Sequence, residues 1–530
     1  MVTTEFKSYI KTILVSVGLL SVVYFYMFCN FWWGNHDWGY LKSGASVESG
    51  LFEARYSQHL FTLLFLDGHI LPILTFLCGF VCISIQAILI GKYFNLSSKS
   101  YVCIALFIGV NPHIYALFYY VYLFFPFVVW SLVGCLLLFL TEGCYRVWKY
   151  LVAVCGYVLL LGSYPPNLAL IFVLFAGKRV LLYAEGKENL KNVFVRMVFW
   201  AGQVIVSVVI YKIIYNCLLD RQLINTDMYN IKTKSIMEIL SCLPLELWNS
   251  VSQLFYGFSF MGGWYFLPLF VLAVVAFWVL MQKDKNKFVM FLGFVFVLLM
   301  SRFSFIVSSH SEYAIFRLMY WGRLGVYLFC LAVLFNEHKK LVKNILFIIL
   351  VVFFVKNVTA NYEIQKVQNF GFVVGRSYQK KLIDTIALNP KFDKNAEYIS
   401  FSFGQPNFRE KFYSDKYKTG ELIGLKLVFE FDMVNFLFWE EVKSPVIIGA
   451  GISGNLILRV DRGGKEKWAS GDYWQNNPQN MEKIRYWLYV NAKPYPSDDA
   501  VYVDDKYLIL VLDPHVFYKR RELVARSLDK

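Results

Sequence analysis

Residues 70–90 read ILPILTFLCGFVCISIQAILI, a run of apolar side chains without a single charge. An α-helix needs about 20 such residues to cross the hydrocarbon core of a bilayer. Further charge-free apolar runs occupy residues 13–28, 267–280, 288–300 and 345–355. Together these runs predict a polytopic α-helical membrane protein.

The composition of the whole chain supports this prediction. Of the 530 residues, 58% are hydrophobic and 19% are aromatic, and the mean hydropathy is +0.49. Soluble domains carry about 45–50% apolar residues, so a soluble fold is excluded. By the same apolar pattern we place about eleven transmembrane helices, at residues 10–30, 69–91, 101–118, 122–141, 150–164, 166–183, 194–219, 264–281, 288–308, 320–335 and 343–358.

The net charge of +15 follows this predicted topology. If the N-terminus lies in the cytoplasm, most Lys and Arg residues fall in cytoplasmic segments and few fall in the outer loops. Such a bias in short loops is the positive-inside rule, and the basic residues would contact anionic lipid head groups. The charge therefore indicates topology and membrane lipids as partners, and no nucleic acid.

The first predicted outer loop, residues 31–68, holds the densest set of ionisable side chains in the first two-thirds of the chain. A connector between two spans needs only a few polar residues, so this density favours chemistry. Asp37 follows the first span within a few residues, where burial and neighbours tune the ionisation of a carboxylate. Asp37 is therefore a candidate general base, and the alternative is that it caps a short helix.

The second half of this loop predicts an amphipathic juxtamembrane helix over residues 51–66, because apolar residues recur at helical spacing from Phe52. Arg55 and His59 share another face of that helix. The guanidinium of Arg55 suits bidentate binding of a phosphate. The equally weighted alternative is that Arg55 pairs with Glu53 or with lipid head groups.

A metal site in this loop is disfavoured. His36, Asp37, His59, Asp67 and His69 are ligand types that suit zinc. No HxxxH or HExxH spacing places two of them on one helical face, and the ten cysteines form no CxxC pair. We therefore predict no metal and no cofactor.

A second ionisable cluster lies near the predicted ends of later spans, on the same outer side. Glu312, Arg317 and Arg323 could complete a phosphate or sugar site there, and a structural network between loops is the alternative. The outer segment before it, residues 220–263, contains an amphipathic pattern at 236–247 that predicts an interfacial helix.

The composition changes after Lys356, and residues 359–530 predict a small mixed α/β domain outside the cytoplasm. The first domain, residues 1–358, is the transmembrane domain. The segment 449–454 matches GxGxxG, but no long helix follows it, so we predict a turn between strands. Helical spacing is found at residues 365–388, and strands are predicted at 397–403, 422–431, 446–448, 456–460 and 501–512.

The assembled pattern resembles the GT-C superfamily of integral-membrane glycosyltransferases, and more narrowly the bacterial O-antigen glucosyltransferases of the serotype-converting Gtr type. Family members often show two adjacent acids in the first loop. His36 replaces one of them here, so Asp37 acts alone or together with Glu48 or Glu53. The resemblance rests on Asn35-His36-Asp37, Phe52-Glu53-Ala54-Arg55 and Gly162-Ser163-Tyr164-Pro165-Pro166-Asn167.

The resemblance implies transfer of a sugar, glucose or another hexose, from a polyprenyl-phosphate-linked donor to a cell-surface polysaccharide or lipid-linked glycan. The location it implies is the bacterial cytoplasmic (inner) membrane, with the C-terminal domain in the periplasm. Asp37 or Glu53 would be the base, and Arg55 with Arg317 or Arg323 would bind the donor phosphate. The full set of substrate-binding candidates is His36, Arg55, His59, Glu312, Arg317 and Arg323.

Two other classes of membrane protein stay open. An O-antigen or polysaccharide polymerase or ligase would also place arginines and a large outer loop at the membrane, and would use a lipid-pyrophosphate-linked glycan. A lipid or glycan transporter would bury charged residues midway along its spans. The predicted spans are nearly free of charge in their middle, which favours surface chemistry over transport.

Overall fold

The computed structural model divides into two compact units. The described residues up to Lys366 belong to the first unit, and those from Val367 on belong to the second. The described residues are 2–30, 44–46, 50–51, 55–69, 71–111, 114, 121–142, 147–221, 223, 234–255, 266–283, 286–307, 315–393, 399–403, 447–451, 458–462, 465–469, 483, 486–487, 490–493, 497–504 and 507–511.

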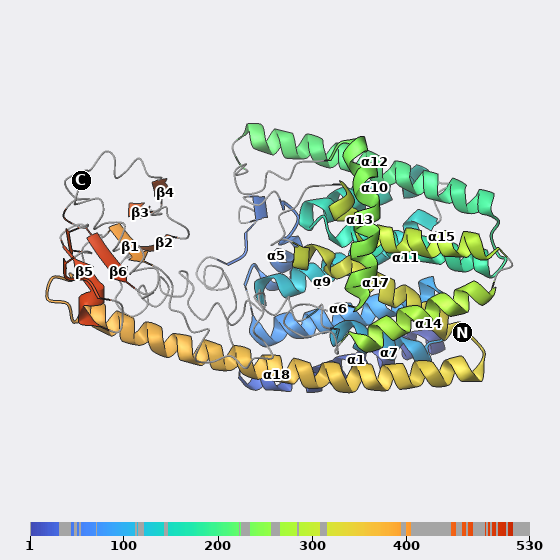
Figure 1. The fold of residues 1–530 in the computed structure, drawn as a ribbon, viewed down its shortest axis with the longest axis horizontal. Helices are drawn as coiled ribbons and strands as arrows, with labels where there is room; N and C mark the ends of the chain where they lie inside the picture. Colours follow the sequence, from blue (N-terminus) through green and yellow to red (C-terminus); the bar gives the residue numbers. More distant parts are fainter. Residues whose placement is uncertain are drawn as a thin grey trace. The chain divides into compact units, whose positions relative to one another are not determined.

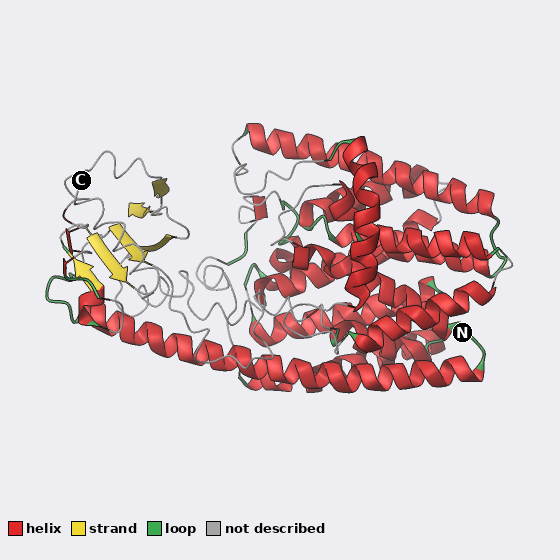
Figure 2. Ribbon diagram, in the orientation of Figure 1, coloured by secondary structure: helices red, strands yellow, loops and turns green. Residues whose placement is uncertain are grey.

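The first unit is built from α-helices (Figures 1 and 2). The last of them, α18, continues past Lys366 into the second unit. The described helices are α1 (Val2–Val23), α2 (Phe25–Cys29), α5 (Leu60–Leu66), α6 (Pro72–Tyr93), α7 (Lys99–Gly109), α9 (Val121–Glu142), α10 (Val147–Ser163), α11 (Asn167–Ala184), α12 (Leu190–Asp220), α13 (Ile236–Phe255), α14 (Leu267–Lys283), α15 (Lys287–Ser301), α16 (Phe303–Val307), α17 (Ile315–Phe335) and α18 (Lys340–Ala387).

The lengths of these helices identify a helical membrane protein. Among the described residues, six helices are long and apolar enough to cross a membrane, and five further apolar helices are shorter. Each predicted span overlaps one of these helices. Helices suit a bilayer because all their backbone hydrogen bonds are internal to the segment. The membrane class is confirmed, and the number of spans stays a prediction.

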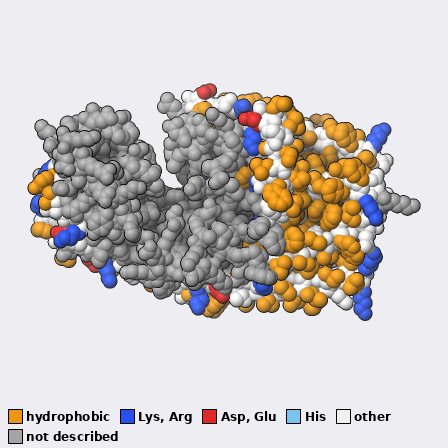
Figure 3. All heavy atoms as spheres, viewed as in Figure 1, with side chains coloured by type: hydrophobic (Ala, Val, Ile, Leu, Met, Phe, Trp, Pro, Cys, Tyr) orange, Lys and Arg blue, Asp and Glu red, His pale blue; other side chains and the backbone are white. Residues whose placement is uncertain are grey.

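Helix α11 is the core of this unit. Nearly all of its residues are buried, among helices α9, α15 and α17, as expected for a helix that is apolar all round. The ring of Phe329 lies over Gly177, where a side chain would leave no room. Helices α1 and α12 are mostly exposed instead, and Figure 3 shows the broad hydrophobic surface of the helical unit, which suits contact with lipid tails.

An ion network ties three helices together at the end of the bundle where α11 finishes, which we call the Ala184 end. The buried guanidinium of Arg179 pairs with Glu142 of α9 and, over 2.6 Å, with Glu188. Nε of Arg196 in α12 lies 3.3 Å from the same Glu188 oxygen. Figure 3 shows Lys and Arg side chains along the right-hand edge of the helical unit. This is the end that the charge bias predicts to be cytoplasmic.

Helix α18 differs from the prediction, which separated a span at 343–358 from a helical pattern at 365–388. The structure has one continuous helix, Lys340–Ala387. Residues 359–364 contain neither Pro nor Gly, so nothing there interrupts the backbone hydrogen bonds. Gly371 and Gly375 lie inside the helix, at a cost of roughly 1 kcal/mol each relative to Ala.

The second unit contains a mixed four-stranded sheet with the order β2-β1-β6-β5. The central strand β1 is parallel to both β2 and β6, and β5 is antiparallel to β6. Two more strands form a separate antiparallel pair. The bounds are β1 (Ile399–Phe403), β2 (Ile447–Gly451), β3 (Leu458–Arg462), β4 (Lys465–Ala469), β5 (Val501–Val503) and β6 (Tyr507–Val511).

Several strand predictions agree with this sheet and one motif prediction does not. The predicted strand at 501–512 is two short strands, and the prediction at 422–431 lies outside the described residues. Gly449 and Gly451 belong to β2, opposite Phe401 and Phe403 of β1, so the prediction that this glycine motif is wholly a turn is wrong.

The contact between α15 and α17 gives a test of the helix packing. A Cβ on Gly322 would lie 2.1 Å from the carbonyl oxygen of Ser301, a backbone atom that moves only with its helix. Gly322→Ala should therefore destabilise the protein by about 1–3 kcal/mol through overpacking. The control is Gly202→Ala, because nothing lies within 4 Å of that position, and it should gain about 0.5–1 kcal/mol. Thermal unfolding in detergent measures both, and equal midpoints would contradict this packing.

Candidate functional site

Breaks between helices gather at one end of the helical unit, which we call the Asn167 end. Helix α10 finishes at Ser163, and α11 begins at Asn167 after a short turn. Gly325 of α17 lies against Leu170 near the start of α11, and Gly322 meets Ser301 at the end of α15. The end of α10, the start of α11, the end of α15 and the first half of α17 therefore lie together at this end.

Residues 56–59 dock onto the Asn167 end as a turn. The backbone N–H of Ser57 donates to the carbonyl oxygen of Gly162 (3.0 Å), and its hydroxyl donates to that of Leu159 (2.5 Å). The Tyr56 hydroxyl donates to the carbonyl oxygen of Val158 (3.0 Å). These bonds anchor the segment to the last turns of α10.

Trp130 of α9 completes this anchoring. Its indole N–H lies 3.1 Å from the carbonyl oxygen of Ser57 and 3.2 Å from that of Gln58. Residues 56–59 are a turn, in which Ser57 O also accepts from the N–H of Leu60, three residues later. The prediction of one continuous helix over residues 51–66 is therefore wrong, and α5 begins only at Leu60.

Arg55 lies over the turn that joins α10 to α11. Its guanidinium carbon is 5.1 Å from the ring centroid of Tyr164, a cation–π contact. Nη1 donates to Oε1 of Gln58 over 3.3 Å. The Tyr164 ring in turn stacks on Phe127 at 4.5 Å. Arg55 therefore belongs to a cationic and aromatic surface at the Asn167 end, and its alternative partner Glu53 lies outside the described residues.

His59 occupies a different environment from Arg55. Only 2% of its surface is exposed, its Nε2 lies 3.0 Å from Nε2 of Gln58, and its ring stacks against Tyr122. Burial, assisted by the charge of Arg55, lowers the pKa of His59 to about 4. The ring is therefore neutral at neutral pH, and the prediction that Arg55 and His59 share one helical face is wrong.

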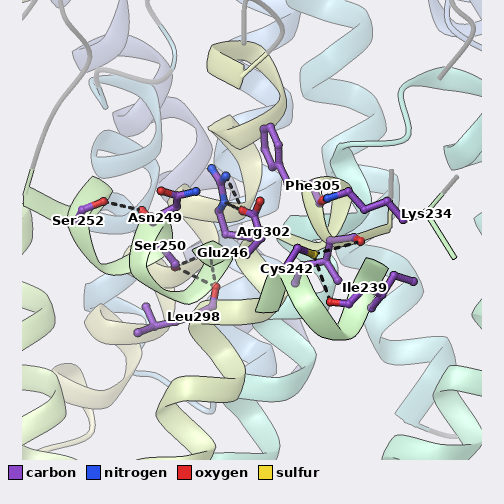
Figure 4. A network of polar contacts seen from close by, with 12 residues as sticks. Lys234, Ile239, Cys242, Glu246, Asn249, Ser250, Ser252, Leu298, Arg302 and Phe305 are labelled. Carbon is purple, nitrogen blue, oxygen red and sulfur yellow. Dashed lines mark hydrogen bonds and ion pairs between the residues drawn. The ribbon is translucent and has the colours of Figure 1, made fainter. Parts of the chain in front are cut away.

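An ion pair between Glu246 of α13 and Arg302, the residue that follows α15, forms the second part of the candidate site (Figure 4). Nε and Nη2 of Arg302 lie 2.8 and 2.6 Å from Oε2 of Glu246, and both residues are buried. The guanidinium carbon also lies 4.0 Å from the ring centroid of Phe305. Sequence reasoning missed Glu246, although it lies inside the predicted interfacial helix.

Helix α13 buries two polar residues against the bundle and exposes several large apolar ones. Glu246 and Ser250, four residues apart, are buried, and the Ser250 hydroxyl donates to the carbonyl oxygen of Leu298. Met237 and Trp248 are 76% and 67% exposed. Figure 1 shows α13 running across the direction of α11 and α12. The predicted helix is confirmed and longer than expected, and its sidedness fits lipid outside and polar groups inside.

Arg323 is the second buried arginine near this end. It follows Gly322 directly and is 5% exposed. Its guanidinium carbon lies 5.8 Å from the ring centroid of Phe266. Because Gly322 meets the backbone of Ser301, the backbones of Arg302 and Arg323 lie close together where α15 and α17 pack.

The structure describes little of the other predicted site residues. His36, Asp37, Glu53 and Glu312 lie outside the described residues, and only the backbone of Arg317 is described. In the part of the chain that is described, no group of three or more His, Cys, Asp or Glu side chains could hold a metal ion.

Comparison with known proteins gives no relative from which the function of the site could be inferred. No protein-family model, no curated protein and no solved structure matches this chain. The resemblance to GT-C glycosyltransferases therefore stays a prediction.

The Glu246–Arg302 pair gives a stability test. Glu246→Ala leaves the buried guanidinium without this carboxylate, which should cost about 3–5 kcal/mol. Adding Arg302→Met removes the second charge and should recover most of that loss. The control is the exposed Glu238→Ala on the same helix, which loses only an N-terminal cap and about 1 kcal/mol. Unfolding of Glu246→Ala at the same midpoint as this control would contradict the buried pair.

The buried His59 gives a test by pH. Because its folded-state pKa of about 4 lies below the usual histidine pKa of 6.5, the unfolded chain binds the proton first as pH falls. Stability is therefore complete above pH 6.5 and falls between pH 6.5 and 4, by on the order of 3 kcal/mol at most. His59→Gln should remove this part of the pH dependence, and the exposed His69→Gln should retain it. Identical pH profiles of unfolding for wild type and His59→Gln would rule out a neutral buried ring.

Proposed function

We propose that this chain is a membrane glycosyltransferase. It moves a sugar, glucose or another hexose, from a polyprenyl-phosphate-linked donor to a cell-surface polysaccharide or a lipid-linked glycan, at the outer face of the bacterial inner membrane. The observation that carries the proposal is two buried arginines near the Asn167 end: Arg302, which pairs with Glu246 of α13, and Arg323, beside the contact of Gly322 with Ser301.

Buried arginines near a lipid-facing helix suit a lipid phosphate. A guanidinium within an apolar bundle is costly, and such residues in membrane proteins are generally functional. Glu246 compensates Arg302, and a donor phosphate would bind at Arg323, since guanidinium groups bind phosphate oxygens in bidentate fashion. The polyprenyl chain would lie along the apolar exposed side of α13, on residues such as Trp248.

The segment around Arg55 supports the same function. Arg55 adds a third guanidinium near the Asn167 end, over the Tyr164 ring, where it would bind the donor phosphate together with Arg317 or Arg323. Aromatic faces also stack on sugar rings. His59 is buried and neutral, so we assign substrate binding in this segment to Arg55, with His59 supporting it through Gln58.

The proposed reaction needs one base and a stabilised leaving group. Asp37 or Glu53 takes the proton from an acceptor hydroxyl, whose oxygen forms a bond to the anomeric carbon of the donor sugar. The bond between that carbon and the phosphate oxygen breaks, and the polyprenyl phosphate leaves with the electron pair. The arginines stabilise the negative charge on the phosphate, so the step needs no cofactor.

The test is transfer of radiolabelled hexose from polyprenyl phosphate to acceptor glycan in membranes. Asp37→Asn should lower the rate by about 10²–10⁴-fold at normal protein level, because an amide cannot take the proton. Glu53→Gln should have a smaller effect if Asp37 is the base. The matched control is Asp220→Asn, an exposed acid at the end of α12, which should transfer normally.

Two outcomes would change this assignment. Normal transfer by Asp37→Asn would remove Asp37 from the mechanism, and an inactive Glu53→Gln would then identify Glu53 as the base. Normal transfer by both variants and by the double variant would overturn the proposed chemistry at this loop.

A further inference from the structure

The side chain of Asn167 is a buried amide whose polar atoms are unpaired. Asn167 is the first residue of α11, and only 1% of its surface is exposed. Within the part of the chain that the structure describes, neither its oxygen Oδ1 nor its nitrogen Nδ2 has a hydrogen-bond partner. Burial of an unpaired polar group is costly, because the group loses its bonds to water. Such a group in a folded protein therefore calls for a functional explanation.

Other buried amides of the helical unit show what a structural role requires. Nε2 of Gln86 in α6 donates to the hydroxyl of Ser131 in α9 over 2.6 Å. Nδ2 of Asn357 in α18 donates to the carbonyl oxygen of Phe353 over 2.9 Å. Each of these amides contributes a bond within or between helices. The Asn167 amide contributes none, so the packing of the helices does not explain it.

The Asn167 amide belongs to the same turn as the Arg55 contact. The backbone N–H of Asn167 donates to the carbonyl oxygen of Tyr164 over 3.0 Å, and the guanidinium carbon of Arg55 lies 5.1 Å from the Tyr164 ring centroid. The Cα–Cβ bonds of a helix tilt toward its N-terminus, so the Asn167 side chain leans toward this turn. An amide and a guanidinium are therefore both associated with the turn that joins α10 to α11.

The backbone at the start of α11 offers no free donor to a ligand. The N–H groups of Leu168 and Ala169 donate to the carbonyl oxygens of Pro165 and Pro166, over 3.1 Å in each case. The two prolines have no N–H. A phosphate held by free backbone amides at a helix N-terminus therefore does not fit this helix. A ligand that binds here would be bound by side chains.

The chemistry of the two side chains indicates which ligand groups they suit. An amide offers a donor at Nδ2 and an acceptor at Oδ1, whereas a guanidinium offers donors only. Neighbouring hydroxyls of a sugar ring supply an acceptor and a donor, so they pair both atoms of the amide. A phosphodiester has only acceptor oxygens and would leave Oδ1 unpaired. The amide of Asn167 therefore suits a sugar, and the guanidinium of Arg55 suits its phosphate.

We propose that Asn167 is a specificity-determining residue that binds hydroxyl groups of the donor hexose. Both atoms of its amide pair with neighbouring hydroxyls, while Arg55 binds the phosphate attached to the sugar. A hexose that lacks one of these hydroxyls leaves an amide atom buried and unpaired, which is a strong basis for rejecting it. The inference rests on the proposed function, because it takes a polyprenyl-phosphate-hexose as the donor.

The kinetic test compares donors that differ by one hydroxyl. The polyprenyl-phosphate forms of glucose, galactose and mannose identify the hexose that the wild type transfers, and the monodeoxy analogues of that hexose are then assayed. The wild type should reject at least one analogue by about 10- to 100-fold in kcat/KM. Asn167→Leu keeps the branched shape without a polar atom. It should lose a similar factor with the parent hexose and treat parent and analogue alike within about threefold.

A matched control is Gln86→Leu, which removes a buried amide that has a partner in Ser131. This variant should discriminate between parent and analogue as the wild type does. If Asn167→Leu does not fold, Asn167→Ala takes its place, because it removes the same polar atoms without adding volume.

Thermal unfolding without donor gives a readout that a structural role would move the other way. Asn167→Leu or Asn167→Ala should unfold at or above the wild-type midpoint, because no hydrogen bond is lost. Gln86→Leu should unfold below it, because Ser131 loses a partner. Saturating donor should then raise the midpoint of the wild type more than that of either Asn167 variant.

The outcomes separate this inference from the function on which it rests. Wild-type discrimination in both Asn167 variants would overturn the sugar contact and leave the glycosyltransferase proposal intact. So would a wild type that accepts every analogue equally, with an equal loss for all donors in the variants, because the amide would then bind the phosphate. Midpoints of both variants several degrees below wild type would show that the amide is bonded within the protein. If the wild type transfers none of the three hexoses, the proposed function and the inference both fail.

Discussion

Unpaired backbone groups are not tolerated in the apolar interior of a membrane protein, and the helical unit is organised by this constraint. Each departure from a helix must be matched by a side chain or a neighbouring backbone group. The indole N–H of Trp130 donates to the carbonyl oxygens of residues 57 and 58. The ammonium group of Lys234 donates to the carbonyl oxygen of Phe305 over 2.6 Å. At the break between α1 and α2, the Gln365 amide accepts from the N–H of Met27 and donates to the carbonyl oxygen of Val23. The supported departures include the turn that carries Arg55 and the region beside Arg302.

The buried arginines at the two ends of the bundle have different surroundings. At the Ala184 end, Arg179 is enclosed by Glu142 and Glu188, an arrangement that closes on itself and joins helices. Near the Asn167 end, Arg302 pairs with Glu246 of α13, and the buried Arg323 follows Gly322, which meets the backbone of Ser301. The guanidinium of Arg55 lies over the Tyr164 ring at the same end. We therefore propose phosphate chemistry at the Asn167 end and a structural role at the other.

The helices could be predicted from the sequence because long charge-free apolar runs are typical of membrane-spanning helices. The details of the site depend on distant residues. The turn at residues 56–59 is held by bonds from α9 and α10, 72 to 102 positions away, so local periodicity wrongly favoured a helix. Glu246 was missed because the spacing of apolar residues in α13 shows that the helix has an apolar and a polar side, but it does not show which side faces the bundle. Strand β4 was missed because Lys465, Glu466 and Lys467 give it little apolar character. Asp37, Glu53 and Glu312 remain predictions from sequence.

The most direct measurement of the central claim is donor choice by the purified protein in lipid nanodiscs. Three donors carrying the same hexose would be compared: polyprenyl-phosphate-hexose, a polyprenyl-pyrophosphate-linked glycan and a nucleotide-activated hexose. Our account predicts that only the monophosphate-linked donor is consumed, with release of polyprenyl phosphate and gain of one hexose by the acceptor glycan. Consumption of the pyrophosphate-linked glycan with chain extension or ligation, or of the nucleotide sugar alone, would contradict it.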